Sequence, residues 1–457
     1  MMFEDLPPEI LHLVSHHLNN NDIFHLICLS RRLYTIIQQN LYAEVFLCGR
    51  NHSSQQVVTF LYAVTRDPRL ASYVRCLWLG DWDCGDGIIH LDKAELDSGY
   101  LLKLVSERTG YSEEERSKWL KDLEKGDDCD PWLALLILQL KDLRKILINW
   151  AYDAKYVLDM LRKAAREQEP VFRHLEEVYA TWWDDTEGSI PSHRMTSFFS
   201  FPSVRKVGCC CLGEDYDSDD DEYDSDNYDS DDSIHLRLEV PLPQSSNITH
   251  LDLANSNAGN GMRDWVQACK VLKSFRLIHH GTLGRGRLYE SLSLHKTTLE
   301  SVWAEPDEGV YIEEQDDWMG SFADFPVLKT ICLLVPNLVG FDENKRPMRK
   351  LLDVLPHSLE TLYLIINREG NGLLDAMEQL VELASAEKFP NLAAIHIEAR
   401  GIQSPKSHSK LQGTKRACEE AGKSFFIHGG EGFFTYCDKP TSWVFGPVNE
   451  ATLLGYY

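Results

Sequence analysis

The sequence lacks the features that mark membrane, secreted and nucleic-acid-binding proteins. Its longest uninterrupted apolar run, Trp132 to Leu138, is far shorter than the roughly 20 residues that span a bilayer. Acidic residues, Glu4 and Asp5, stand at the N-terminus in place of the basic residues of a secretion signal. The formal net charge of -25 opposes binding to phosphate backbones and anionic membrane surfaces. We therefore expect no nucleic-acid partner, no membrane partner, and a cytoplasmic or nuclear location.

Signals for metal binding and catalysis are also lacking. The 12 cysteines include no CxxC pair, so they are predicted to be reduced and mostly buried. Cys209-Cys210-Cys211 is expected to place two thiols on one side of a strand, but no second ligand pair stands at zinc spacing. Buried thiols are therefore favoured over a metal site. Since no GxSxG, Walker or HExxH motif is present, we expect no metal, no cofactor and no enzymatic activity.

The sequence does contain a recurring pattern of three apolar residues, with two residues between the first and second and one between the second and third. The second and third positions favour a short strand with one buried face, and amphipathic intervals such as 373–388 favour helices. One such unit cannot close a core, so neighbouring units are expected to stack. A possible first copy begins at Tyr42. The ten clear copies begin at Val74, Leu143, Leu175, Val204, Ile248, Leu272, Leu299, Leu328, Leu359 and Leu392.

This pattern resembles the leucine-rich repeat family, whose L-x-x-L-x-L-x-x-N run is matched by LETLYLIIN at residues 359–367. Most other copies lack the asparagine, so we expect an irregular array. The interval from Val74 to Leu143 is 69 residues, about twice the unit length, and holds either an extra helical pair or an unrecognised repeat. Within it, Asp130 is predicted to cap a helix that Pro131 opens.

A second long interval contains an acidic segment, Glu214 to Ser233, with 12 acidic residues and no basic one. Like charges at this density oppose compaction, so the segment is predicted to be disordered. Without it the interval has the normal repeat length, which indicates a loop inserted between two consecutive units. Ser218, followed by Asp221 three residues later, resembles a phosphorylation site for an acid-directed kinase.

The first 40 residues predict a small helical module with more apolar surface than one helix face needs. Leu6-Pro7-Pro8 can start a first helix, and Asp22 is predicted to cap a second helix that continues to Ile37. A piece of this size is too small to hold a sufficient core alone, so something else should cover part of its surface. Either it caps the first repeat, or it docks on another protein.

The order L-P-x-E-I-L, followed by D-I-x-x-L-x-x-L-S-R-R-L, resembles the F-box family. With the run that begins LYAEVFLCGR, it also resembles F-box proteins of filamentous fungi. The resemblance implies docking on a Skp-type adaptor and, through it, on a cullin ubiquitin ligase. Some of the positions that it implies for the adaptor contact must instead fill the module's own core. They are Leu6, Pro7, Ile10, Leu11, Leu26, Leu29 and Leu33.

In each strand of the repeated pattern, the residue between the second and third apolar positions points away from the core. In a repeat array it would lie on the concave face, where large aromatic residues favour protein binding. Coverage of these residues by inserted loops is the equal alternative. The residues expected to contact a target protein are Trp78, Tyr179, Asp252, Arg276, Trp303, Tyr363 and His396.

These expectations give an α/β solenoid. A small all-α F-box occupies 1–47, and an irregular leucine-rich-repeat-like array of short parallel strands and helices occupies 48–213 and 234–457, with the acidic insert at 214–233. The expected function is substrate recognition for a Skp-cullin-F-box ubiquitin ligase, in which the repeats bind an unknown target protein. The alternative is a ligase-independent scaffold whose acidic loop recruits a basic partner.

Overall fold

The fold is taken from a computed structural model of the chain. The chain divides into two compact units, the first built mainly from residues 1–184 and the second mainly from 205–447. The residues that the structure describes are 6–47, 53–80, 82, 104–105, 110–126, 128–151, 154–167, 171–182, 188–214, 240–306, 318–344, 346–366, 371–399 and 404–428.

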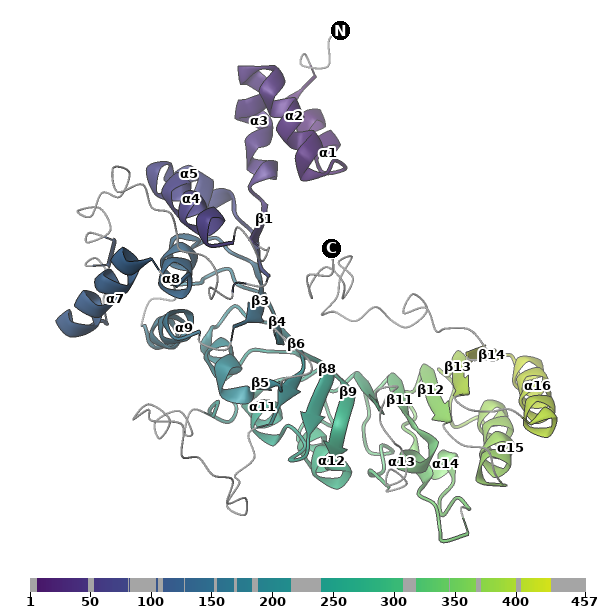
Figure 1. Ribbon diagram of the computed structural model, residues 1–457. Coiled ribbons are helices and arrows are strands. Elements are labelled where there is room, and N and C mark those ends of the chain that lie inside the picture. Colours follow the sequence, from purple (N-terminus) through teal and green to yellow (C-terminus); the bar gives the residue numbers. More distant parts are fainter. Residues whose placement is uncertain are drawn as a thin grey trace. The chain divides into compact units, whose positions relative to one another are not determined.

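The first unit begins with three helices, α1 (Pro8–Ser15), α2 (Asn20–Leu29) and α3 (Arg31–Leu41) (Figure 1). The predicted single helix from Asp22 to Ile37 is wrong, because Ser30 adopts an extended conformation and ends α2. The Ser30 hydroxyl accepts a hydrogen bond from the Leu33 backbone N–H at 3.2 Å and caps α3. The cap of α2 is Asn19, not Asp22: the Asp22 N–H donates to Asn19 Oδ1 at 2.9 Å.

A small apolar core joins these three helices. Ile23 and Ile27 on α2, and Leu33 and Ile37 on α3, are spaced four apart and are buried with Leu11 of α1. Residues four apart share one face of a helix, so each helix has its own inner face. The broad apolar surface of the sequence therefore belongs to two helices, each with a separate core-facing stripe.

The chain continues from α3 into a sheet of parallel strands. In the first unit these strands are β1 (Glu44–Leu47), β2 (Cys76–Leu79), β3 (Lys145–Trp150) and β4 (Glu177–Trp182), paired in chain order. Residues 44–47 of the expected F-box segment thus form a strand. The second apolar position of each repeated pattern is aligned across the sheet, at Val45, Leu77, Ile146 and Val178. Helices α8 (Asp130–Gln139) and α9 (Tyr156–Arg166) lie to one side of these strands (Figure 1).

Of the two interpretations of the long interval after Val74, the described residues fit the helical pair. After β2, the described part of the interval contains two helices, α7 (Glu113–Lys125) and α8. Strands β2 and β3 are hydrogen-bonded directly to each other, so no strand of the interval lies between them. The apolar run from Trp132 to Leu138 is entirely buried in α8, as expected of a helix that is apolar all round.

The prediction that Asp130 caps its own helix is wrong. Asp130 is the first residue of α8, and its carboxylate accepts hydrogen bonds from the backbone N–H groups of Tyr156 and Val157, the latter at 2.9 Å. It therefore caps α9, a different helix. Burial raises the pKa of Asp130 to about 7, although these two backbone hydrogen bonds act in the opposite direction.

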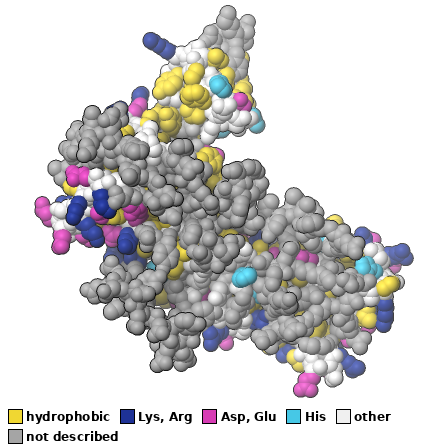
Figure 2. Space-filling model, viewed as in Figure 1, with side chains coloured by type: hydrophobic (Ala, Val, Ile, Leu, Met, Phe, Trp, Pro, Cys, Tyr) yellow, Lys and Arg dark blue, Asp and Glu magenta, His cyan; other side chains and the backbone are white. Residues whose placement is uncertain are grey.

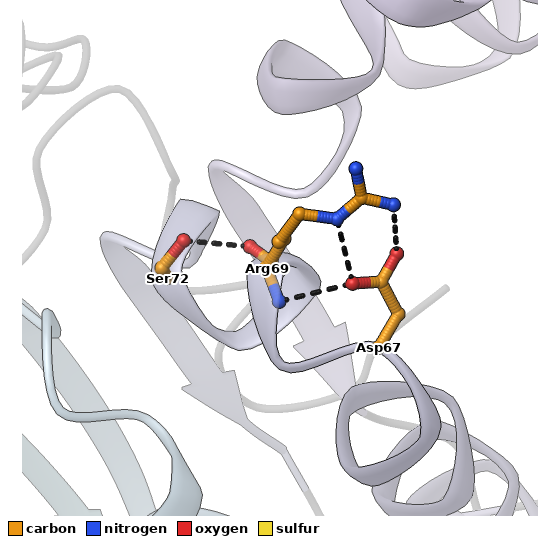
Figure 3. A network of polar contacts seen from close by, with 3 residues as sticks. All are labelled: Asp67, Arg69 and Ser72. Carbon is orange, nitrogen blue, oxygen red and sulfur yellow. Dashed lines mark hydrogen bonds and ion pairs between the residues drawn. The ribbon is translucent and has the colours of Figure 1, made fainter.

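Exposed caps follow simpler local rules. Asp67 separates α4 (Ser53–Arg66) from α5 (Pro68–Tyr73) and accepts a hydrogen bond from the Arg69 N–H at 3.1 Å (Figure 3). The Arg69 guanidinium donates two hydrogen bonds to the same carboxylate, from Nε to Oδ1 at 2.9 Å and from Nη2 to Oδ2 at 2.8 Å (Figure 3). The Ser72 hydroxyl donates to the Arg69 carbonyl at 2.7 Å (Figure 3). The hydrogen bond from the Arg69 side chain lowers the pKa of Asp67. Sequence neighbours alone supply this cap.

The second unit also has parallel strands in chain order. They are β6 (Lys206–Cys210), β8 (His250–Ala258), β9 (Ser274–Leu283), β10 (Ser301–Pro306), β11 (Thr330–Leu334), β12 (Thr361–Ile366), β13 (Ala394–Ala399) and β14 (Ser424–His428). The second apolar positions of consecutive strands again pair, for example Leu362 with Ile395. Strand β14 was not predicted, since Gly422 stands where the pattern has its first apolar residue.

Helices and short elements connect the strands of the second unit. The predicted helix over 373–388 is present as α15 (Asn371–Ser385). Two short strands, β5 (Ile190–Pro191) and β7 (Leu212–Gly213), pair with each other. The other elements are η2 (Ser192–Ser200), α11 (Arg263–Ala268), α12 (Arg285–Ser293), α13 (Val335–Val339), α14 (Leu351–Val354) and α16 (Pro405–Glu420).

Strands β6 and β8 flank the acidic segment in sequence and pair directly, Lys206 opposite His250. The segment therefore lies in the chain between two strands that are neighbours in the sheet. Residues 215–233 and Ser218 lie outside the described residues, so the expected disorder and phosphorylation remain predictions.

Thiols in the described residues are buried, except for Cys28 on α2, in agreement with the prediction that most cysteines are buried. Among the described residues, no helix combines the length and the apolar character that a bilayer crossing requires.

Asp130→Asn is expected to lower the free energy of unfolding by about 1–3 kcal/mol at about pH 4, because the amide NH2 group cannot accept a hydrogen bond from the second buried N–H, whereas the hydroxyl oxygen of the neutral acid can. The folded pKa of about 7 lies above the ordinary value of 3.8. The wild-type carboxyl group therefore contributes its stability below the ordinary value and loses it as pH rises through the folded pKa. The deficit of the variant should therefore shrink as the pH rises from about 4 to about 7 and stay constant above that.

Urea unfolding across this pH range measures the deficit of Asp130→Asn. Glu114→Gln, on an exposed position of α7, is the matched control and should show no such change. A deficit that grows with pH would contradict the assigned direction of the Asp130 pKa.

Ser30→Ala is expected to lower the stability of α3 by about 1 kcal/mol, because the Leu33 N–H loses its capping acceptor. Hydrogen exchange of the first-turn amides of α3 measures this loss. Ser117→Ala, a hydroxyl within α7 that donates to the Glu113 carbonyl, provides the control. Equal exchange in Ser30→Ala and wild type would show that Ser30 does not cap the helix.

Candidate functional site

The three N-terminal helices carry large apolar side chains on their outer surface. Leu29 is 71% exposed, Phe24 52% and Ile10 42%, and Leu13 and Tyr34 are also exposed. Figure 2 shows hydrophobic side chains gathered over this part of the molecule. Because the module has already filled its core with other residues, these side chains do not stabilise the fold by burial. They are available to a partner.

The structure sorts the seven positions proposed for adaptor contact. Pro7, Ile10 and Leu29 are exposed, and Leu6 and Leu26 are half-buried. Leu11 and Leu33 are buried in the core of the module. The set of exposed residues is accordingly smaller than the set of positions that the resemblance implies.

Polar contacts fix the helices that present this surface. The Arg32 guanidinium donates a hydrogen bond to the Leu6 carbonyl at 3.1 Å, which joins α3 to the segment before α1. Gln39 on α3 lies 3.0 Å from the His12 ring nitrogens, and Asn40 donates to the Ser15 hydroxyl. These contacts, together with the apolar core, hold the helices that carry the exposed apolar residues in fixed positions relative to one another.

Sequence reasoning missed three members of the exposed surface, Leu13, Phe24 and Tyr34. The helical period of the sequence indicates that these three residues face outward. Leu13 follows Ile10 by three residues, which places both on one face of α1. Phe24 and Tyr34 each follow a buried residue directly and so turn away from the core. Once the helix break at Ser30 is known, this assignment follows.

The seven positions proposed for target binding lie at equivalent register positions. In the first unit, Trp78 and Tyr179 both flank Leu147. In the second unit, Asp252 pairs with Arg276 and Arg276 with Trp303. Trp303 in turn pairs with Cys332, Cys332 with Tyr363, and Tyr363 with His396. The structure thus places these residues in one row in each unit.

Side chains of the row in the second unit lie against one another. The Arg276 guanidinium lies 5.4 Å from the Trp303 ring centre, and the Trp303 and Tyr363 rings are 4.9 Å apart. Tyr363 stacks on His396 at 4.1 Å, and His396 stacks on Phe426 of β14 at 4.6 Å. Phe426 was missed because its strand was missed.

The side chains of these rows differ in burial, so neither exposure nor coverage, the two alternatives that the sequence leaves open, applies to all of them. Tyr179, Asp252, Arg276 and Trp303 are buried, whereas Trp78, Tyr363 and His396 are half-buried. Trp303 packs in an apolar cluster with Cys332, Leu334 and Ile365, and residues two apart in a strand share a face. This face of the sheet therefore has apolar packing of its own. Target binding by the row stays a prediction.

Charge at the partly exposed end of the row is low. Burial, and to a lesser degree the neighbouring His428, lower the pKa of His396 to about 4, so its ring is neutral near pH 7. Burial raises the pKa of Tyr363. Nδ1 of His396 lies 2.9 Å from Nε2 of His428, within hydrogen-bond distance. The arrangement is a neutral stack of rings suited to apolar or aromatic contacts.

Within the described ranges, no group of three or more His, Cys, Asp or Glu side chains is placed to hold a metal ion.

Comparison with known proteins bears on the N-terminal helices. Residues 3–42 match the model of the F-box domain, which corresponds to α1–α3. No curated protein matches the chain in a sequence search. The match covers the segment that presents the exposed apolar residues Ile10, Phe24 and Leu29. The chain therefore contains an F-box domain, which is formed by α1, α2 and α3.

Proposed function

We propose that this chain is the substrate-recognition subunit of a Skp-cullin-F-box ubiquitin ligase. Its F-box docks on a Skp-type adaptor, and its strand-and-helix region binds the target protein. The observation that carries the proposal is the exposed apolar surface on a module whose core is already filled. The chain itself performs no chemical step in this proposal.

Docking is driven by removal of this surface from water. Burial of an isoleucine or leucine side chain contributes about 1.5–3 kcal/mol, so Ile10 and Leu29 together supply a substantial part of a specific interface. The Pro7 ring lies before α1, at the leucine-proline start that the F-box resemblance assigns to the adaptor contact. Leu11 and Leu33 support the surface from within the core.

We assign target recognition to a leucine-rich-repeat-like array. Two observations support this assignment. Each repeated pattern contributes one strand, and neighbouring strands within each unit pair at equivalent positions of the pattern. Within the array, the partly exposed rings of Tyr363, His396 and Phe426 form the best-placed contact surface. Aromatic residues are enriched among those that dominate binding energy at protein interfaces.

Ile10→Asp combined with Leu29→Asp is expected to weaken adaptor capture by about 100-fold or more, because two charges would be desolvated in the interface. Co-purification with a Skp-type adaptor measures capture, and circular dichroism reports the fold. The matched control is Leu242→Asp with Leu294→Asp, two exposed leucines of the second unit, which should leave capture unchanged. Equal capture by the docking variant and wild type would remove the adaptor assignment.

A second candidate function is a ligase-independent scaffold. The acidic segment between β6 and β8 favours it, since 12 acidic residues offer electrostatic attraction to a basic partner. In the ligase proposal, deletion of 214–233 should leave both adaptor and target capture unchanged. Loss of the main partner on deletion, with adaptor capture intact, would favour the scaffold.

A further inference from the structure

A tryptophan and a basic hairpin lie side by side at the surface of the second unit. The hairpin follows α13 and precedes α14, and Phe341 and Pro347 are its antiparallel bridge partners. Trp318 is joined to the same region through its neighbour Met319, whose N–H donates to the Asn337 carbonyl of α13 at 2.9 Å. Segments on either side of β11 in the sequence therefore meet at one surface.

Hydrogen bonds fix the conformation of the hairpin. The Met348 N–H donates to the Gly340 carbonyl at 2.9 Å, and the Asp342 N–H donates to the Arg346 carbonyl at 3.0 Å. The Asp342 carboxylate accepts hydrogen bonds from the N–H groups of Asn344 and Arg346 at 2.9 and 2.8 Å. A surface that is already ordered in this way loses less conformational freedom when a partner binds.

Arg349 packs between the hairpin and the tryptophan. Its guanidinium carbon lies 3.6 Å from the centre of the Trp318 ring. The φ of Gly340 is 61°, and a Cβ atom there would lie 2.9 Å from Arg349 Nη1 and 3.1 Å from Met348 Cε. The absence of a side chain at Gly340 thus lets these groups pack closely. Trp318 and Met348 nevertheless remain 37% and 56% exposed.

The surface carries positive charge in a strongly acidic chain. Residues 340–350 contain four basic and two acidic side chains, whereas the net charge of the whole chain is -25. Among the ion pairs of the described residues, one joins Lys350 to Glu382 at 3.6 Å, and none includes Arg346 or Arg349. Exposed charges are screened over about 8 Å at physiological ionic strength, so this local excess decides which short ligand is attracted.

We propose that Trp318, Arg346, Met348 and Arg349 form a docking surface for an acidic peptide segment of a partner protein. The two guanidinium groups donate to carboxylates of the segment, and an apolar side chain of the segment packs on Trp318 and Met348. Tryptophan and arginine are enriched among the residues that dominate binding energy at interfaces. A nucleic acid or an anionic membrane would extend past the hairpin and meet the negative charge of the rest of the chain.

This inference rests on the proposed function only in assigning the acidic segment to the ligase target. Docking of the segment itself needs no adaptor. Peptide binding and adaptor capture are therefore measured separately on the same preparations of the full-length chain.

Fluorescence anisotropy with a short labelled peptide tests the surface. The probe alternates glutamate with small polar residues around one central leucine, and a peptide with glutamine in place of each glutamate is its uncharged counterpart. The acidic peptide should bind, and binding should weaken as salt rises, because exposed charge contacts are screened. Arg346→Gln combined with Arg349→Gln should weaken binding by about 10-fold or more, because both charge-assisted contacts are lost.

Met348→Glu is a second variant that retains both arginines and Trp318. Its carboxylate should repel the peptide and weaken binding by about 10-fold. The matched control, Arg263→Gln with Arg416→Gln, removes the same charge at exposed positions of α11 and α16 and should leave binding unchanged. Circular dichroism reports the fold of each variant.

Equal binding by wild type and by both hairpin variants, or equal binding of the acidic and glutamine peptides, would overturn the proposal. Binding that occurs only after deletion of 214–233 would assign the surface to the chain's own acidic segment and exclude an external partner. Tighter binding of a single-stranded RNA than of the peptide would also contradict it. Loss of peptide binding with intact adaptor capture counts against this surface alone, whereas the reverse result counts against F-box docking.

Discussion

The structure depends on the way in which each parallel strand enters its sheet. One backbone carbonyl accepts hydrogen bonds from two successive N–H groups of the next strand: Arg75 from Arg144 and Lys145 in the first unit, and Lys329 from Glu360 and Thr361 in the second. These contacts fix the register, so equivalent positions of the repeated pattern pair. A shift of one residue would turn every buried side chain to the opposite face. The rows of equivalent side chains follow from this register.

The F-box domain obeys a different constraint, that of size. Three short helices can bury few side chains among themselves, and Leu11, Ile23, Ile27, Leu33 and Ile37 fill the available interior. The remaining apolar residues must lie outside. An excess of apolar residues in a short sequence thus leaves an exposed apolar surface, while the capping contacts at Asn19 and Ser30 keep that surface on defined helices.

Predictions failed where the decisive contact comes from a distant residue or from an unusual backbone conformation. Asp130 has the sequence context of a local cap, yet the N–H groups that it satisfies belong to Tyr156 and Val157, far along the chain. Cys211 interrupts strand alternation because its backbone is left-handed. Trp303 occupies an outward strand position, yet it is buried in a second apolar cluster. Local patterns contain no information about these neighbours.

The sequence by itself determined most of the strand positions and the F-box helical segment, because hydrophobic periodicity acts along the chain. Only the tertiary structure decided which F-box leucines fill the core and which face outward. The same holds for the burial of Arg276 and the closeness of the Cys210 and Cys211 thiols. The physical reason is that burial and side-chain proximity depend on packing between segments, whereas periodicity reports only the face on which a residue lies.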